Sequence, residues 1–307
     1  NPSCIQPLLE NENAILFNAS LSKESVSFRI LLHPLTKDKY ITRKILQKGD
    51  YEPDMEKFIA RALPLTEKNE TPPHNQHPRP VWAVDVGANV GFHSMHMARR
   101  GANVISFEPA PDTAALIKCS ADELLLDDDL GAAGDGRRRS AGSIEVVEAG
   151  ASDVESTGML LRHPDSPGMT TFVGDNVSFP LEEVGSGNGT TVGAIRLLRI
   201  ENVLVERGVP EGRSDSLRLL KVDAEGFELQ ALRGINLTRF PFQFLTFEFF
   251  PEMLRASGAD PVDLLTLVRD EGYNCDYEKF VTQTTRNELN TWVGGIKQHH
   301  VNIFCQL

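Results

Sequence analysis

The stretch Val81-Trp-Ala-Val-Asp-Val-Gly87-Ala-Asn-Val-Gly91 decides the fold. Its first six residues, Val81 to Val86, are a short apolar run of the kind found in strands buried on both faces of a parallel sheet. Gly87 and Gly91 flank a tight turn, and a helix is predicted from Phe92 to Arg100. Because glycine lacks a Cβ atom, the backbone of this turn can approach a bound ligand closely. The succession of strand, glycine turn and helix predicts the start of an α/β ligand-binding domain.

Predicted strands and helices alternate from this turn to the end of the chain. Strands are predicted over residues 103–107, 144–149, 217–223, 242–249, 273–277 and 301–307, and helices over 112–126, 201–207, 225–232 and 261–271. Asp112 is the expected N-cap of its helix, and residues 194–200 are predicted to form an edge strand. This alternation predicts a doubly wound, mostly parallel sheet with helices on both faces. Ligands of such sheets bind at the carboxyl ends of the central strands.

Glu108 ends the second predicted strand, seventeen residues beyond Gly91. In a nucleotide-binding α/β unit, an acid at this place accepts hydrogen bonds from the ribose hydroxyls. The alternative interpretation of Glu108, taken alone, is an exposed glutamate with no role in binding. The glycine turn that precedes it favours a bound nucleoside. The dinucleotide fingerprint requires glycine where Asn89 stands. A ligand with a nucleoside and an amino-acid tail therefore fits better, with an NAD-dependent oxidoreductase as the alternative.

Four blocks resemble the FkbM family of S-adenosylmethionine-dependent, class I methyltransferases in order, spacing and strand context. They are Asp85 to Gly91, Phe107-Glu-Pro, Leu220-Lys-Val-Asp-Ala-Glu-Gly-Phe-Glu-Leu and Phe247-Glu-Phe. The resemblance covers residues 81–307. It implies a Rossmann-like sheet of seven strands with an antiparallel final strand, and O-methylation of a hydroxyl, often on a sugar. A protein that binds S-adenosylmethionine without catalysis is a further alternative.

The resemblance also implies a cofactor site, residue by residue. Asp85, Gly87, Asn89 and Gly91 are expected to contact the methionine part of S-adenosylmethionine, Glu108 the ribose, and the loop with Ser152 and Asp153 the adenine side. Ala88, Pro109 and Asp223 complete the predicted cofactor site.

Three carboxylates are candidates for the catalytic work. Asp223 and Glu225 follow the fourth predicted core strand directly, and Glu248 lies at the end of the fifth. Methyl transfer needs alignment of the reacting atoms, and a neutral hydroxyl benefits from a base that takes its proton. Two carboxylates can divide these tasks if their environments separate their pKa values. The alternatives are that Asp223 closes a turn, Glu225 caps a helix and Glu248 forms a structural ion pair.

Two basic side chains near these blocks are assigned structural roles. Lys221 is predicted to be a strand residue paired with an acid, and His93 to be packed or solvent-facing rather than catalytic. The sequence shows no metal constellation, because the adjacent His299 and His300 of a predicted strand point to opposite faces.

The composition excludes several classes of protein. The 307 residues carry a formal net charge of −12, which disfavours nucleic acid as a partner. No apolar stretch approaches the roughly 20 residues that a membrane-spanning helix needs. Residues 1–80 are predicted to be an N-terminal extension ending in a proline-rich linker over 71–80. Together with the insertions 127–142 and 156–193, they leave the methyl acceptor open.

Glycosylation motifs and cysteines bear on the compartment. Five Asn-x-Ser/Thr motifs start at Asn18, Asn69, Asn176, Asn188 and Asn236, where roughly two are expected by chance. This excess favours a secretory lumen over the cytoplasm. Because the chain opens on Asn1 rather than Met, an N-terminal signal or anchor is expected to precede it. Four cysteines fit either compartment, and Cys275 with Cys305 is the pair expected to bond if the lumen is right.

Overall fold

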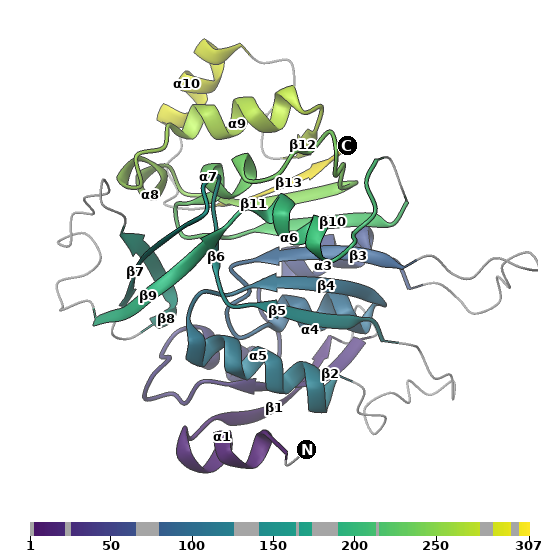
Figure 1. Cartoon of the computed structure of the whole chain (residues 1–307), viewed down its shortest axis with the longest axis vertical. Helices are drawn as coiled ribbons and strands as arrows, with labels where there is room; N and C mark the ends of the chain where they lie inside the picture. The colour runs from purple at the N-terminus through teal and green to yellow at the C-terminus, as the bar shows by residue number, and fades with distance from the viewer. Residues whose placement is uncertain are drawn as a thin grey trace, which may run out of the picture.

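The computed structural model describes most of the chain (Figure 1). The described residues are 3–21, 26–65, 80–125, 141–163, 166–173, 190–212, 215–276, 285–295 and 301–307. Most of the predicted linker 71–80, most of the insertion 127–142, and the pair His299 and His300 lie outside them. Within the described ranges, no helix is both long enough and apolar enough to cross a membrane.

A seven-stranded sheet in the order β12-β13-β11-β10-β3-β4-β5 forms the centre of the fold. Its strands are β3 (Val81–Val86), β4 (Ala102–Phe107), β5 (Ser143–Val147), β10 (Leu217–Val222), β11 (Phe244–Phe249), β12 (Asn274–Asp276) and β13 (Val301–Gln306). The strands from β11 to β5 run parallel, whereas β13 is antiparallel to β11 and β12. The chain winds outward from β3 on one side and from β10 on the other. The doubly wound, mostly parallel seven-stranded sheet is confirmed.

Helices cover both faces of this sheet, as the side chains of its central strands show. Val84 and Leu220 belong to one apolar cluster, whereas their neighbours Ala83 and Leu219 belong to another. The first cluster includes α6 (Ile200–Glu206), α7 (Glu228–Arg233), α8 (Pro251–Ala256), α9 (Pro261–Asp270) and α10 (Arg286–Gly295). The second includes α3 (Pro53–Ala62), α4 (Phe92–Arg99) and α5 (Pro111–Leu124). Because successive strand residues point to opposite faces, this division explains the continuous apolar runs of the strands.

The residues before β3 pack on the helices of one face. They form α1 (Ile5–Asn11), β1 (Ile15–Leu21), β2 (Val26–Leu32), α2 (Ile41–Lys48) and α3. β1 and β2 are an antiparallel hairpin, and β2 lies against α4 and α5, where the Leu31 N–H donates to Ser120 Oγ at 3.0 Å. A disulfide between Cys4 and Cys119 joins the start of α1 to α5. The division of the chain at residue 80 stays a prediction.

A second, four-stranded sheet has the order β6-β9-β7-β8. Its strands are β6 (Gly150–Ala151), β7 (Ser156–His163), β8 (Ser166–Val173) and β9 (Thr190–Leu198). The prediction of an edge strand over 194–200 was wrong, because β9 is an inner strand of this sheet, between β6 and β7. Buried Ile195 and Leu197 alternate with exposed Ala194 and Arg196, the pattern of a strand covered on one face only.

Two predicted helix starts were also wrong. The N-cap of α5 is Ala110, and Asp112 lies in the first turn, where both its carboxylate oxygens accept from the Arg162 guanidinium. α7 begins at Glu228 instead of residue 225. Glu225 and Gly226 have φ angles of +50° and +98°, which a right-handed helix does not allow.

The expected pairing of Cys275 with Cys305 is confirmed. β12 and β13 are antiparallel neighbours in which these two residues face one another, and their sulfurs form a disulfide. With Cys4 and Cys119, all four cysteines of the chain are bonded.

Candidate active site

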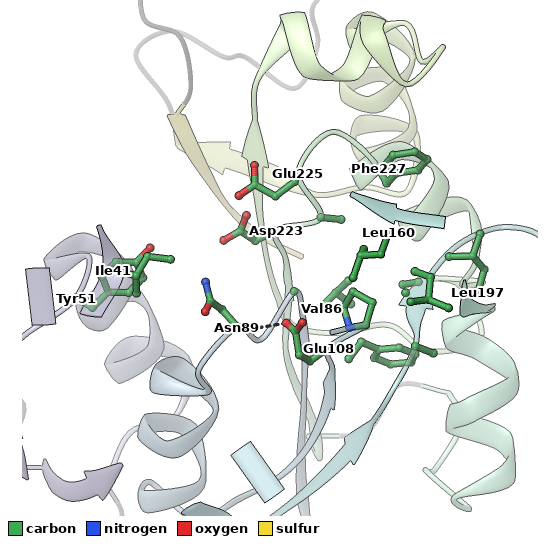
Figure 2. Close-up of a pocket in the computed structure, with 18 residues that line it drawn as sticks. Ile41, Tyr51, Val86, Asn89, Glu108, Leu160, Leu197, Asp223, Glu225 and Phe227 are labelled. Carbon is green, nitrogen blue, oxygen red and sulfur yellow. Dashed lines mark hydrogen bonds between the residues drawn. The ribbon is translucent and has the colours of Figure 1, made fainter. Parts of the chain in front are cut away.

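A pocket opens at the carboxyl ends of β3, β4 and β10, beside the point where the strand order reverses (Figure 2). The space between its walls is about 780 Å³ when the open mouth is included. Six of the predicted site residues line it together: Gly87, Asn89, Glu108, Pro109, Asp223 and Glu225. The pocket thus gathers side chains from the blocks that the sequence placed at strand ends.

The glycine turn brings β3 and β10 together at the base of the pocket. Gly87 has a φ angle of +71°, and a Cβ atom there would lie 1.7 Å from the backbone oxygen of Asp223. The N–H groups of Gly87 and Ala88 both donate to Phe107 O at 3.0 Å, which fixes the turn against β4. Ala88 is buried and Gly91 is the N-cap of α4, and neither lines the pocket. Only glycine fits at position 87, because any side chain would collide with backbone.

Glu108 lies at the middle of the pocket, held by the turn. Its Oε2 accepts from the Asn89 N–H and its Oε1 from the Ala110 N–H, each at 2.9 Å. Burial raises the pKa of this carboxyl to about 7, although the two backbone hydrogen bonds act in the opposite direction. Each oxygen keeps a second lone pair, so the carboxylate can accept two hydroxyl groups of a ligand.

One end of the pocket is an apolar slot. Figure 2 shows Leu160, Leu197 and Phe227 on the same side of Glu108, away from Asn89. The slot is completed by Phe107, Pro109, Ala149, Gly150, Ala151 and Ile195. Sequence reasoning missed Leu160, Ile195 and Leu197, which belong to the second sheet and pack with Ala110, just after β4. For Ile195 and Leu197, the alternation of apolar and polar residues over Ile195-Arg-Leu197 was the one signal in the sequence.

Ser152 and Asp153 lie just beyond this slot and do not line it. The Ser152 N–H donates to Leu198 O at 2.9 Å, which continues the pairing of β6 with β9. Ser152 Oγ donates to Asp153 Oδ1 at 3.3 Å. The predicted contact of these two residues with adenine stays a prediction, and Gly150 and Ala151 stand closer to the pocket.

The other end of the pocket is acidic, and its base is a buried ion pair. Lys221 Nζ lies 3.0 Å from Asp85 Oδ1 and 3.6 Å from Asp223 Oδ2. Although burial alone would lower the pKa of Lys221, the charges of Asp85 and Asp223 raise it. Asp85 is fully buried, accepts from Ser94 Oγ at 2.6 Å with its second oxygen, and does not line the pocket. The structure thus gives Asp85 a supporting position below the pocket, and pairs Lys221 with an acid as predicted.

Three further carboxylates gather around Asp223. Burial raises the pKa values of Asp223 and Glu225, and the charge of Asp223 raises that of Glu225 further. Burial, followed by the charges of Asp223 and Glu225, also raises the pKa of Glu248, whose Oε2 is covered and has no partner within the described part of the chain. Burial raises the pKa of Glu228 to about 7. The acids therefore hold protons more tightly than usual, as a general base for a hydroxyl requires.

The N-terminal residues supply a wall that sequence reasoning did not find. Ile41 and Tyr51 line the pocket, and burial followed by the charges of Glu52, Asp223, Glu225 and Glu248 raises the pKa of Tyr51. Glu52 Oε2 lies 3.0 Å from His93 Nε2. Burial alone would raise the pKa of Glu52, but this hydrogen bond and the charge of His93 lower it to about 2. His93 is 5% exposed, and its packed state agrees with the prediction.

A doubly wound sheet of this strand order, with a ligand pocket at its switch point, has the architecture of a Rossmann-like methyltransferase. The chain matches the methyltransferase FkbM domain over residues 85–275. It therefore belongs to the FkbM methyltransferase family and is an enzyme of that class. This membership implies a methyl donor.

Three curated methyltransferases show the range of relatives. Methyltransferase sdnD of Sordaria araneosa is 29% identical over 213 residues, which are 64% of this chain and 75% of that protein. The hexuronic acid methyltransferase AglP of Haloferax volcanii is 25% identical over 204 residues, 66% of each chain. The 31-O-demethyl-FK506 methyltransferase FkbM of Streptomyces tacrolimicus is 25% identical over 177 residues, 51% of this chain and 60% of that protein.

Proposed function

We propose that the protein transfers a methyl group from S-adenosylmethionine to a hydroxyl of a sugar or another polyhydroxylated small molecule. The order of environments along the pocket carries this proposal. An apolar slot, the Glu108 carboxylate, the glycine turn and an acidic end follow one another. The donor has the same order of parts, namely adenine, ribose, and a positively charged sulfur with an amino-acid tail. The names of AglP and of the FK506 methyltransferase support a sugar or hydroxyl acceptor.

The residues of the pocket fit this cofactor. Glu108 offers free lone pairs to a ribose diol, and the slot around Leu160 and Leu197 can bury a flat base. At Gly87, the space that a side chain would fill is taken by backbone, so the turn presents only main chain to the amino-acid tail. Asp223, beside Lys221, would hold the cofactor amine. Asp85 and Gly91 support this arrangement from below, without direct contact.

Glu225 is the proposed base. S-adenosylmethionine supplies an activated methyl carbon on a positively charged sulfur, so the protein must align the acceptor and receive its proton. Glu225 lines the pocket beyond Asp223, and no ion pair of Glu225 occurs among the described residues. Its raised pKa makes it a stronger base than an exposed carboxylate. Glu248 does not line the pocket, and its predicted catalytic role stays a proposal that rests on its charge next to Glu225.

The two alternatives are weaker. An NAD-dependent oxidoreductase conflicts with membership of a methyltransferase family and with Asn89 where a dinucleotide site needs glycine. A protein that only binds S-adenosylmethionine would have no use for the carboxylates with raised pKa values around Asp223.

A labelling experiment tests the proposal. S-adenosylmethionine with an isotopically labelled methyl group is incubated with a panel of pyranosides and polyols, using wild-type protein and Asp223→Ala. We expect labelled product from the wild type and none from the variant, while Asp270→Asn, a change at a 62% exposed position, behaves like the wild type. Absence of S-adenosylhomocysteine binding in calorimetry, or labelling that does not depend on Asp223, would contradict the proposal.

We also propose a secretory lumen as the compartment. Two disulfides use all four cysteines, and bonds of this kind persist in oxidising compartments. Asn18 and Asn236, which start two of the glycosylation motifs, are exposed. A mobility shift on removal of N-glycans from protein expressed in eukaryotic cells tests this, and an unglycosylated protein with free thiols would contradict it.

A further inference from the structure

The pocket wall opposite the apolar slot comes from residues 41–52, which precede the stretch matched by the family. Figure 2 shows Ile41 and Tyr51 on the side of the pocket away from Leu160 and Leu197. If the slot holds adenine, this wall faces the end at which the methyl group is transferred. The acceptor must enter at this end, because adenine fills the opposite end.

Tyr51 is held in place by three neighbours. The Lys44 ammonium lies over its ring at 4.8 Å from the centroid. The imidazole of His93 packs at 5.5 Å between ring centroids, and Phe92 packs edge-on at 6.2 Å. Because these groups pack on the ring, we expect its edge and hydroxyl, and not a ring face, to meet a ligand. A fixed phenol is a preorganised hydrogen-bond partner for a hydroxylated acceptor.

The charges around Tyr51 are mostly negative. Asp223, Glu225 and Glu248 interact electrostatically with its phenol, as does Glu52. Lys221 lies against Asp85 at the base of this end, and Lys44 packs over a face of the Tyr51 ring. An anionic acceptor that meets the edge of Tyr51 would therefore face Asp223 and Glu225, which line the pocket, whereas neither lysine lines it. Like charges brought together in this way repel, which weakens the binding of an anionic partner.

We propose that residues 41–52 form the acceptor wall of the enzyme, with Tyr51 binding a hydroxyl of the acceptor, and that the acceptor is neutral or cationic. This inference rests on the proposed function and adds the class of substrate. Uronates and phosphate esters are disfavoured by the carboxylates, whereas neutral sugars, amino sugars and other uncharged polyols are accepted. The wall determines acceptor binding and leaves cofactor binding to the glycine turn and Glu108.

Binding measurements separate this inference from the function it rests on. Calorimetry first determines the affinity of wild type, Tyr51→Phe and Tyr40→Phe for S-adenosylhomocysteine. Tyr40 is 58% exposed in the same segment and provides the matched control. We expect all three proteins to bind S-adenosylhomocysteine equally. A wild type that does not bind it contradicts the proposed function itself, whereas a loss confined to Tyr51→Phe contradicts only the acceptor role.

Three probes that differ in charge then test the acceptor class. With S-adenosylhomocysteine saturating, saturation-transfer NMR compares methyl glucoside, methyl glucosaminide and methyl glucuronide. We expect the first two to bind, the glucuronide to bind at least about tenfold more weakly, and Tyr51→Phe to weaken glucoside binding roughly three- to tenfold. Glu225→Gln is expected to narrow the gap between glucuronide and glucoside.

Several results would overturn the inference. They are glucuronide binding as tight as that of the glucoside, an unchanged glucoside affinity in Tyr51→Phe, and no binding of any of the three pyranosides to protein that binds S-adenosylhomocysteine. If Tyr51→Phe does not fold, Glu225→Gln is compared with wild type instead. The same ratio of glucoside to glucuronide affinity in both proteins would count against the inference.

Discussion

The Lys221 ammonium lies 3.0 Å from Asp85 Oδ1, and the two side chains are 3% and 0% exposed. Asp85 is the penultimate residue of β3, before the glycine turn, and Lys221 is the penultimate residue of β10, before Asp223. The pair therefore joins the two strands on which the proposed cofactor and base residues stand. Lys221 Nζ is also 3.3 Å from the Gly87 oxygen, so it fixes the turn as well.

Removing one partner of this pair is expected to destabilise the protein. Asp85→Asn leaves a buried ammonium with reduced compensation, which costs about 3–5 kcal/mol in comparable pairs. The free energy of unfolding from urea titration should fall accordingly, whereas Asp54→Asn at an 80% exposed position should leave it within about 0.5 kcal/mol. In the double variant Asp85→Asn with Lys221→Met, the loss should be smaller than the sum of the single losses. Additive losses would mean that the two side chains do not depend on each other.

Gly87→Ala tests the contact between the turn and β10. The added methyl group would collide with the Asp223 backbone oxygen, and the φ angle of +71° adds strain. We expect at least a hundredfold loss of S-adenosylhomocysteine affinity, because β3 and β10 must separate. Gly208→Ala is the control, since Gly208 has a φ angle of +65° and open space around its Cβ position. Backbone strain should lower the free energy of unfolding by about 1–2 kcal/mol in both variants. Only Gly87→Ala should weaken ligand binding. Equal losses of affinity in the two variants would contradict the steric explanation.

Sequence patterns predicted those parts of the site that are fixed locally. Gly87, Glu108 and Asp223 each follow a buried strand within two residues, so the parallel sheet brings them to one edge. Tyr51 and Leu160 could not be predicted, because they reach the pocket through packing between segments distant in sequence. The adenine contact predicted for Ser152 stays a prediction, and the pairing of β6 with β9 brings Gly150 and Ala151 to the pocket.

Two buried histidines should make the protein less stable in acid. Burial and the charge of Lys37 lower the pKa of His33 to about 4, and burial lowers that of His96, which is fully buried and has no hydrogen-bond partner within the described ranges. Below pH 6.5 the unfolded chain binds protons that the folded chain cannot. The contribution of these histidines to the free energy of unfolding is therefore fully present above pH 6.5. It declines as the pH falls toward 4, by about 3 kcal/mol for His33 alone. His33→Asn and His96→Leu should each flatten the curve of unfolding free energy against pH, and parallel curves for wild type and variants would contradict this.

Glu108 should make cofactor binding depend on pH. Its carboxyl has a pKa of about 7, and only the ionised form has lone pairs for both ribose hydroxyls while it accepts from Asn89 and Ala110. As the pH falls from 8 to 6, the ionised fraction and the affinity for S-adenosylhomocysteine should both fall about tenfold. Glu108→Gln should bind about ten- to a hundredfold more weakly at pH 8 and show no such slope, because an amide does not titrate. Glu148→Gln, at a side chain that is 40% exposed and paired with Lys118, should keep the wild-type slope. A pH-independent wild-type affinity measured by calorimetry would show that the nucleoside does not meet the Glu108 carboxylate.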